Sequence, residues 1–209
     1  MRRGLALALG ALLAGAVACG GPGATPAPAV LSAEPTPAGT YRGTELDPPQ
    51  PRPTFTLTDT TGARYDFAAR TRGRPTLLFF GFTHCPDICP TTMASLAAAL
   101  RGVDEPLRRS VQVVLVTTDP ARDTGPVLAR WLRAFDRDLP TRFVGLTGTV
   151  AQVEAAQAVA RVPVAEDGGR THSTQVLLYG VDDYARVTYL ADVAPEALRH
   201  DLPLVAKGA

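Results

Sequence analysis

A continuous apolar run at residues 76–82 is followed almost at once by two cysteines, Cys85 and Cys89. An apolar run of this length is typical of a buried central strand. Two residues four positions apart lie one turn apart on the same face of a helix, so the pair predicts a helix that begins just after the strand. At a helix N-terminus the dipole and the free N–H groups favour thiolate over thiol. Thiolates held in this way bind a soft metal or exchange with disulfides.

The rest of the globular part alternates between strand and helix patterns. Two hairpins are expected, one from residues 55–58 and 64–67 and one from 174–179 and 186–190. Further strands are expected at 76–82, 111–117 and 142–146, and helices at 91–100, 126–135, 149–160 and 195–205. This order of elements predicts an α/β domain with a thioredoxin-like fold and an extra N-terminal β-hairpin.

The first part of the chain has the pattern of an exported and tethered protein. Residues 1–19 are predicted to be a signal peptide, because two arginines precede a short apolar run. The small residues before Cys19 resemble a bacterial lipobox, in which this Cys would be lipidated; cleavage of a plain signal peptide nearby or an uncleaved anchor is the alternative. Residues 20–53 are rich in Pro, so we expect a flexible tether. Residues 54–209 would then be the folded domain, held on the extracytoplasmic face of the cell membrane.

The charge balance bears on the choice of partner. The chain has 21 basic and 20 acidic residues and a net charge of +1. Nucleic-acid binding needs a field of concentrated positive charge, which this balance does not supply. No nucleic-acid partner is therefore expected.

A third candidate ligand is His172, in the loop before the strand expected at 174–179. In a thioredoxin-like sheet that loop faces the N-terminus of the first helix, so His172 can approach both sulfurs. Two thiolates and one imidazole suit Cu(I), and with an added ligand they can hold Cu(II). The simpler alternatives are a structural disulfide between Cys85 and Cys89 and a hydrogen-bonding role for His172. His84 adjoins Cys85, and we expect it to be exposed rather than a ligand.

Three stretches of sequence resemble one known family. Gly-Phe-Thr-His-Cys-Pro-Asp-Ile-Cys-Pro at residues 81–90 resembles the signature of the Sco/SenC copper-protein family. Thr-Thr-Asp-Pro-Ala-Arg-Asp at 117–123 resembles the Asp-Pro-x-Arg-Asp loop of that family, and Thr-His-Ser at 171–173 resembles its ligand loop. The resemblance covers about residues 53–205.

This resemblance implies a membrane-tethered copper metallochaperone rather than an enzyme. Cys85, Cys89 and His172 would bind one copper ion, as Cu(I) or Cu(II), and Asp119 would support the site or dock a partner. The implied partners are the copper-bearing subunit of cytochrome c oxidase, whose binuclear copper centre the family helps to assemble, and another copper chaperone outside the cytoplasm. Some members of the family reduce the apo-oxidase cysteines instead, so Cys85 and Cys89 could also be a redox-active pair.

Two other classes of protein share the predicted fold. A disulfide reductase or redox sensor of the thioredoxin type would resemble its relatives in a Cys-x-x-Cys spacing and a cis-Pro, but this chain has a longer spacing and carries His172 in the corresponding loop. A peroxidase of the peroxiredoxin or glutathione-peroxidase class would resemble its relatives in a Trp context around the thiol. The single Trp of this chain, Trp131, lies instead on an expected helix as a core residue.

Overall fold

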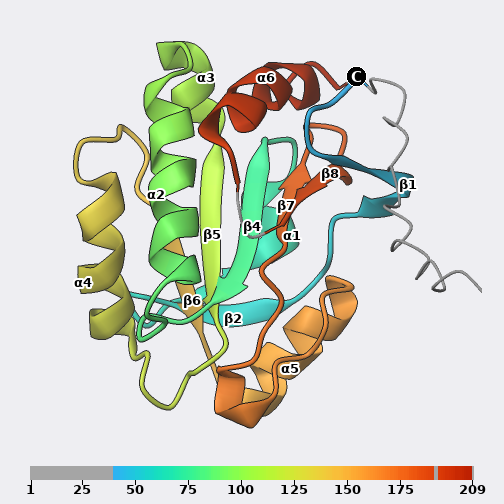
Figure 1. The fold of residues 1–209 in the computed structure, drawn as a ribbon. Helices are drawn as coiled ribbons and strands as arrows, with labels where there is room; N and C mark the ends of the chain where they lie inside the picture. The colour runs from blue at the N-terminus through green and yellow to red at the C-terminus, as the bar shows by residue number, and fades with distance from the viewer. Residues whose placement is uncertain (1–39, 191–192, 209) are drawn as a thin grey trace, which may run out of the picture. The chain divides into compact units, whose positions relative to one another are not determined.

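The computed structural model describes residues 40–190 and 193–208 of the chain. The predicted signal peptide, Cys19 and most of the predicted tether lie outside these residues, so the structure does not test them. The described residues form one eight-stranded mixed sheet in the order β1-β8-β7-β4-β5-β6-β2-β3, with helices packed against it (Figure 1). Within this part of the chain, no helix is both long enough and apolar enough to cross a membrane.

The helices and strands follow the predicted order, with three additions. The strands are β1 (Thr44–Pro51), β2 (Thr56–Asp59), β3 (Arg64–Asp66), β4 (Thr76–Gly81), β5 (Gln112–Thr117), β6 (Val144–Thr147), β7 (Val176–Tyr179) and β8 (Tyr184–Tyr189). The helices are α1 (Phe67–Thr71), α2 (Ile88–Arg101), α3 (Glu105–Ser110), α4 (Gly125–Asp136), α5 (Val150–Val159) and α6 (Pro195–Val205). The α/β thioredoxin-like fold is confirmed, and the extra hairpin β2–β3 extends the sheet beyond β6.

Strand β4 organises the edge of the sheet where the candidate ligands lie. All six of its residues are buried, and it pairs parallel with β5 and antiparallel with β7. Gly81 at the end of β4 lies opposite Thr117 at the end of β5, and Phe79 lies opposite Val176 at the start of β7. The loop after β4, the loop after β5 and the loop before β7 therefore meet at one edge of the sheet.

Alternate residues of β4 belong to two hydrophobic cores, one on each face of the sheet. Leu77 and Phe79 pack in a cluster with residues of α2, α4 and α6, whereas Leu78 and Phe80 pack with residues of α1 and α5. Burial of each such side chain contributes about 1.5–3 kcal/mol. Because both faces of β4 are covered, the strand and the loop that follows it are held in one position.

Strand β1 corrects the predicted end of the tether. The sequence predicted a flexible segment through residue 53, but Thr44–Pro51 forms a strand that pairs antiparallel with β8. Pro has no N–H and cannot donate a hydrogen bond to a neighbouring strand. The prolines are compatible with β1 because it lies at the edge of the sheet, where outward-facing backbone positions have no neighbouring strand to bond. None of the eight residues of β1 is buried, so the Pro-rich segment adds no core of its own and is ordered by its pairing with β8.

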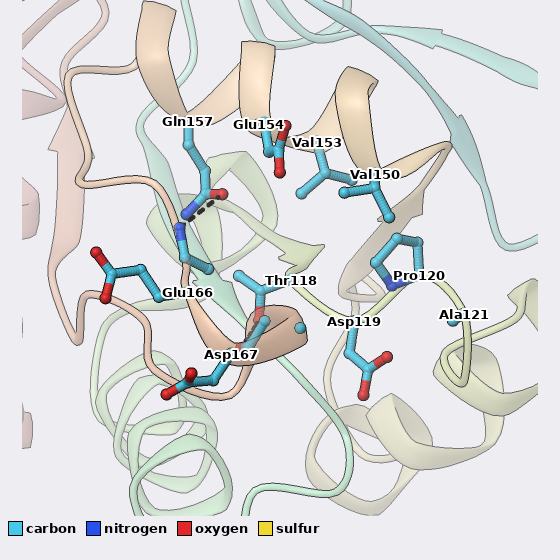
Figure 2. Close-up of a pocket in the computed structure, with 13 residues that line it drawn as sticks. Thr118, Asp119, Pro120, Ala121, Val150, Val153, Glu154, Gln157, Glu166 and Asp167 are labelled. Carbon is cyan, nitrogen blue, oxygen red and sulfur yellow. Dashed lines mark hydrogen bonds between the residues drawn. The ribbon is translucent and has the colours of Figure 1, made fainter.

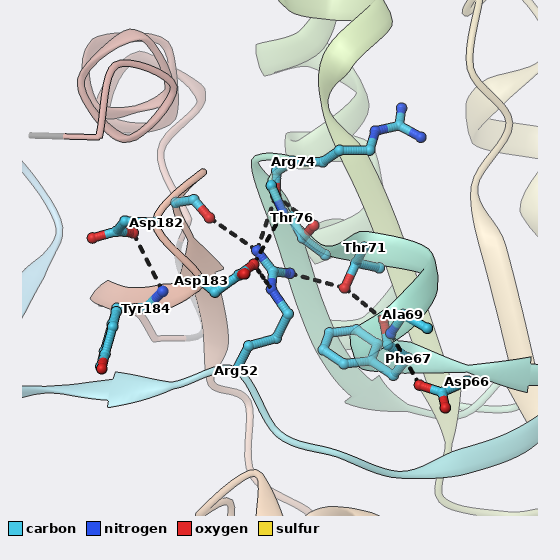
Figure 3. A network of polar contacts seen from close by, with 12 residues as sticks. Arg52, Asp66, Phe67, Ala69, Thr71, Arg74, Thr76, Asp182, Asp183 and Tyr184 are labelled. Atoms are coloured by element: carbon cyan, nitrogen blue, oxygen red, sulfur yellow. Dashed lines mark hydrogen bonds and ion pairs between the residues drawn. The ribbon is translucent and has the colours of Figure 1, made fainter.

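Arg52 fixes the chain where β1 ends (Figure 3). Its side chain is only 3% exposed, and Nε donates a hydrogen bond to Oδ1 of Asp183 at 2.8 Å. The other guanidinium nitrogens donate to Oγ1 of Thr71 at 2.9 Å and to the carbonyl oxygens of Arg74 and Gly180 at 3.0 and 2.9 Å. One buried side chain thus joins the entry of the domain to α1, to the start of β4 and to the turn between β7 and β8.

The short helices α1 and α3 were not predicted. They have five and six residues, too few to show a helical period in the sequence. Local capping supports α1, because Oδ1 of Asp66 accepts a hydrogen bond from the N–H of Ala69 at 3.0 Å.

Candidate metal centre

The sequence predicted that Cys85 and Cys89 both lie on one helix, and this is wrong for Cys85. Helix α2 begins at Ile88, so Cys85 lies in the turn before the helix and Cys89 lies in its first turn. Sγ of Cys85 accepts a hydrogen bond from the N–H of Cys89 at 3.4 Å. Cys85 therefore satisfies one of the free N–H groups at the helix N-terminus, a role that Ser or Asp often has.

The two thiols, both free, differ in exposure and in acidity. Cys85 is half-buried; burial opposes its ionisation, but the N–H groups of Asp87, Cys89 and Ile88 outweigh burial and lower the pKa of the Cys85 thiol. Cys89 is fully buried, and burial raises the pKa of its thiol. The prediction that the helix N-terminus favours the thiolate is thus confirmed for Cys85 and wrong for Cys89, where loss of water outweighs the local N–H groups.

His172 approaches the buried thiol from the loop before β7. Its Nε2 lies 3.4 Å from Sγ of Cys89, and its Nδ1 donates a hydrogen bond to the carbonyl oxygen of Ser173 at 2.8 Å. With Nδ1 donating to this carbonyl, the neutral form of the imidazole presents the lone pair of Nε2 to the sulfur. The rings of Phe79 and Phe82 meet the imidazole edge-on, with centroids 6.1 and 5.4 Å away. The imidazole is therefore held in one tautomer and one orientation.

Cys85, Cys89 and His172 form one cluster. Their ligand atoms all lie within 4.8 Å of one another, as the sequence predicted from the topology. Two sulfurs and one imidazole nitrogen are soft donors that Cu(I) and Zn²⁺ accept. In the part of the chain that the structure describes, no carboxylate belongs to this cluster, so the site does not suit a hard cation such as Mg²⁺.

Asp119, predicted to support the site or to dock a partner, lies outside the cluster. Its carboxylate is buried and forms an ion pair with Arg122. Figure 2 shows it at a cavity of about 350 Å³, lined also by Glu154, Glu166 and Asp167. The loop that lines one side of this cavity leads directly to the candidate ligand His172. The docking role of Asp119 stays a prediction.

The carboxylate that contacts the loop carrying Cys85 is that of Asp123, which sequence reasoning missed as a site residue. It is fully buried, and its Oδ1 accepts a hydrogen bond from Oγ1 of Thr83 at 2.6 Å. Its Oδ2 accepts from the N–H of Thr83 at 2.9 Å and from Oγ1 of Thr117 at 2.7 Å. The available signal was the second acidic residue of the Asp-Pro-x-Arg-Asp motif, which follows the end of a buried strand.

His84 lies outside the cluster, as expected. Its side chain is 53% exposed, and its Nδ1 lies 3.0 Å from Oγ1 of Thr83 and 3.6 Å from Oδ1 of Asp123. Trp131 lies on α4, packs against the core and meets the ring of Phe135 edge-on at 4.8 Å. Its position agrees with the core role predicted for it.

The fold and the cluster together define a class of protein. A thioredoxin-like domain that gathers two thiols and one imidazole at the edge of its sheet is suited to soft-metal binding or to thiol chemistry. The model of one family, SCO1/SenC, matches residues 44–205. The chain therefore belongs to the SCO1/SenC family.

Individual relatives agree with this assignment. Protein SCO2 homolog, mitochondrial, from Danio rerio is 38% identical over 137 residues, which cover 61% of this chain and 46% of that protein. The structure of Bradyrhizobium japonicum ScoI with copper bound has a TM-score of 0.61 and 30% identity, and the match covers 74% of this chain and 98% of the other. The apo Sco1 protein from Thermus thermophilus has a TM-score of 0.66 and 29% identity, over 79% and 96% of the two chains. The chain thus matches about half of the Danio rerio protein, but nearly all of each solved domain.

Proposed function

We propose that this chain is an extracytoplasmic copper metallochaperone that assists assembly of the binuclear copper centre of cytochrome c oxidase. In this proposal Cys85, Cys89 and His172 together bind one copper ion. The observation that carries it is the cluster itself, in which three soft donor atoms lie within 4.8 Å of one another. Similarity to a ScoI structure with copper bound supports the choice of metal. The resemblance to the Sco/SenC family supports the choice of oxidase as acceptor.

The arrangement of the three donors suits an ion that must be handed on. Cys89 is fully buried, and His172 is oriented by the backbone of Ser173, so these two donors are held in place. Cys85 is half-buried in a turn outside the helix and, unlike His172, is not oriented by a backbone carbonyl, so in this proposal it is the donor that a partner displaces first. A thiol or imidazole of an acceptor protein could therefore replace Cys85 before the other two ligands are released.

Copper titration of the reduced full-length protein tests the proposed site. We expect one Cu(I) per chain in anaerobic competition with a chromophoric Cu(I) chelator. Cys85→Ala, Cys89→Ala and His172→Ala should each raise the Kd at least about 100-fold, because a direct ligand matters more than the outer hydrogen-bond partners whose loss costs about 10- to 100-fold.

The matched control is His200→Gln. His200 lies on α6, next to Arg199, which packs against the C-terminal end of α2 at Gly102, whereas the candidate ligands lie at the other end of that helix. Its Kd should stay within about twofold of wild type, since no ligand is lost. An unchanged Kd in His172→Ala would reject the proposed site.

A second candidate function, reduction of disulfides in the apo-oxidase, is favoured by the inequality of the two thiols. Cys85 is half-exposed with a lowered pKa, and Cys89 is buried next to it. In this chemistry the Cys85 thiolate attacks a partner disulfide, forms a mixed disulfide and releases one partner thiol. Cys89 then displaces the second partner thiol, so that the partner gains two electrons and this chain is left with a Cys85–Cys89 disulfide.

His172→Ala separates the two functions, because it removes a proposed copper ligand and keeps both thiols. The measurement is rescue of oxidase activity in cells that lack the native protein, with copper supplied or withheld. Rescue by this variant regardless of copper supply would identify reduction as the required step. Loss of rescue, with the dithiol still able to reduce a model disulfide, would identify delivery.

Membrane attachment through Cys19 is a further part of the proposal, and it is supported by the leader pattern of the sequence. In a bacterial host we expect the wild-type chain in the membrane fraction. Cys19→Ser should move a measurable share of the protein to the soluble extracytoplasmic fraction, because a lipobox without its Cys cannot be lipidated. Membrane retention of this variant would instead favour an uncleaved anchor.

A further inference from the structure

The three candidate ligands come from two loops that are distant in the sequence. The thiols come from the loop after β4 (residues 82–87) and the start of α2, and the imidazole comes from the loop before β7 (residues 166–175). A third segment, residues 117–123 from the last residue of β5 onward, makes hydrogen bonds to both loops; we call it the bridging segment. It provides none of the ligands in the cluster.

On the thiol side, the bridging segment acts through Asp123. Its buried carboxylate accepts both the N–H and the hydroxyl of Thr83, which lies two residues before Cys85. The same carboxylate accepts the hydroxyl of Thr117, so it ties the thiol loop to the end of β5. Without this carboxylate, the buried hydroxyl of Thr117 and both donors of the half-buried Thr83 would lose their acceptor, and the thiol loop would lose this link to the end of β5.

On the imidazole side, the bridging segment acts through Thr118. Its Oγ1 donates a hydrogen bond to the carbonyl oxygen of Gly169 at 2.7 Å, and its N–H donates to the carbonyl oxygen of Gly81 at 2.9 Å. Gly169 has a φ of +89°, and a Cβ there would lie 1.8 Å from the carbonyl oxygen of Thr118. The loop that leads to His172 therefore packs backbone to backbone on the bridging segment, and Figure 2 shows Thr118 against this loop.

We propose that the bridging segment sets the separation of the thiol and imidazole ligands, with Asp123 and Thr118 as positioning residues. Asp123 acts through Thr83 on the loop of Cys85, and Thr118 acts through Gly169 on the loop of His172. Only the copper-binding test of this proposal rests on the proposed copper function. Its structural content, that each residue holds one loop, is testable in the metal-free protein.

The copper measurement uses two nearly isosteric variants of the full-length chain, Asp123→Asn and Thr118→Val. Each keeps all three ligands and removes hydrogen-bonding capacity behind one of them. We expect the Kd for Cu(I), measured by chelator competition, to rise about 10- to 100-fold in each variant, as for other residues that orient metal ligands. Values within about twofold of wild type in both variants would overturn the proposal.

Two matched controls separate positioning from general stability. Asp136 on α4 is a buried carboxylate that accepts the N–H of Phe143 at 2.7 Å, so Asp136→Asn removes the same chemistry elsewhere. Thr76 at the start of β4 is buried and donates to the carbonyl oxygen of Arg74 at 2.9 Å, so Thr76→Val matches Thr118→Val. Both controls should bind Cu(I) as wild type does. A rise in their Kd equal to that of the test variants would overturn the proposal.

Amide hydrogen exchange of the metal-free, reduced protein supplies a readout without copper. Asp123→Asn should speed exchange in residues 82–89, and Thr118→Val should speed it in residues 166–173, with little change in the other loop. Exchange that rises equally across the whole domain would indicate destabilisation alone and would overturn the proposal.

Should Asp123→Asn fail to fold, Thr83→Val is the substitute variant. It removes only the hydroxyl link and should change Kd and exchange in the same direction. If wild type binds no copper, the proposed function fails, and the exchange result alone decides this proposal.

Discussion

Cys85 and Cys89 are the same residue type four positions apart, yet their surroundings give them different chemistry. The thiol of Cys85 lies in a turn and meets N–H groups at the start of α2, which stabilise its ionised form. The thiol of Cys89 lies inside the core between β4 and α2, where no water stabilises a charge. Gly81 is part of this arrangement, because a Cβ at that position would lie 2.9 Å from Sγ of Cys89. A side chain at 81 would push the sulfur out of its place.

Alkylation should therefore be selective between the two thiols. In the reduced, metal-free protein at neutral pH, we expect iodoacetamide to modify Cys85 at least about tenfold faster than Cys89, because only thiolates react readily. A lowered pKa keeps the thiolate present at lower pH, so the rate at Cys85 should reach half its maximum below the pH of an ordinary thiol. Mass spectrometry of peptides from timed samples measures each cysteine separately. Equal rates at the two sites would contradict the assigned environments.

At the scale of elements, strand β1 illustrates how tertiary contacts override composition. A Pro-rich segment cannot form a core alone, and the sequence therefore predicted a tether there. The segment is ordered as a strand because β8 offers a free edge and because the buried Arg52 binds three different parts of the domain at its end (Figure 3). The entry of the chain is thus part of the folded domain.

Arg52→Ala should lower the free energy of unfolding by about 3 kcal/mol or more, because it leaves Asp183 and several acceptors without their buried partner. The matched control is Arg186→Ala, since Arg186 pairs with Asp182 in the same β7–β8 turn but is 33% exposed. Its loss should cost about 1 kcal/mol or less. Urea denaturation of the reduced proteins measures both changes. Equal losses of unfolding free energy in the two variants would show that the buried network around Arg52 stabilises the domain no more than a partly exposed ion pair.

At the scale of the whole molecule, the mixed sheet joins metal binding to thiol redox state. Because β5 runs parallel to β4 and β7 runs antiparallel to it, loops from three distant parts of the chain meet at one edge. The same two sulfurs serve as candidate ligands and as a candidate redox pair. A disulfide between them would remove both thiolate donors and leave His172 as the sole donor of the cluster.

Oxidation should therefore abolish copper binding reversibly. After treatment with a mild disulfide-forming oxidant, we expect the chain to lose its Cu(I) uptake in the chelator competition, and treatment with a phosphine reductant should restore it. Peptide mass spectrometry would confirm that the Cys85–Cys89 disulfide has formed. Full copper uptake by the oxidised protein would show that the two cysteines are not the ligands.

The sequence by itself determined the local chemistry and the order of the elements. The apolar run of β4, the cysteines after it and His172 before β7 were all visible as patterns, because hydrophobic runs and residue spacing are properties of the local sequence. The fold followed from that order, since few topologies accommodate it.

Only the tertiary structure decided how the residues of the site differ from one another. It placed Cys85 in a turn and Cys89 in the core, and it made Asp123 rather than Asp119 the carboxylate that holds the thiol loop. It also turned part of the predicted tether into β1. Burial and hydrogen bonding between segments distant in sequence depend on three-dimensional packing, which no local pattern records.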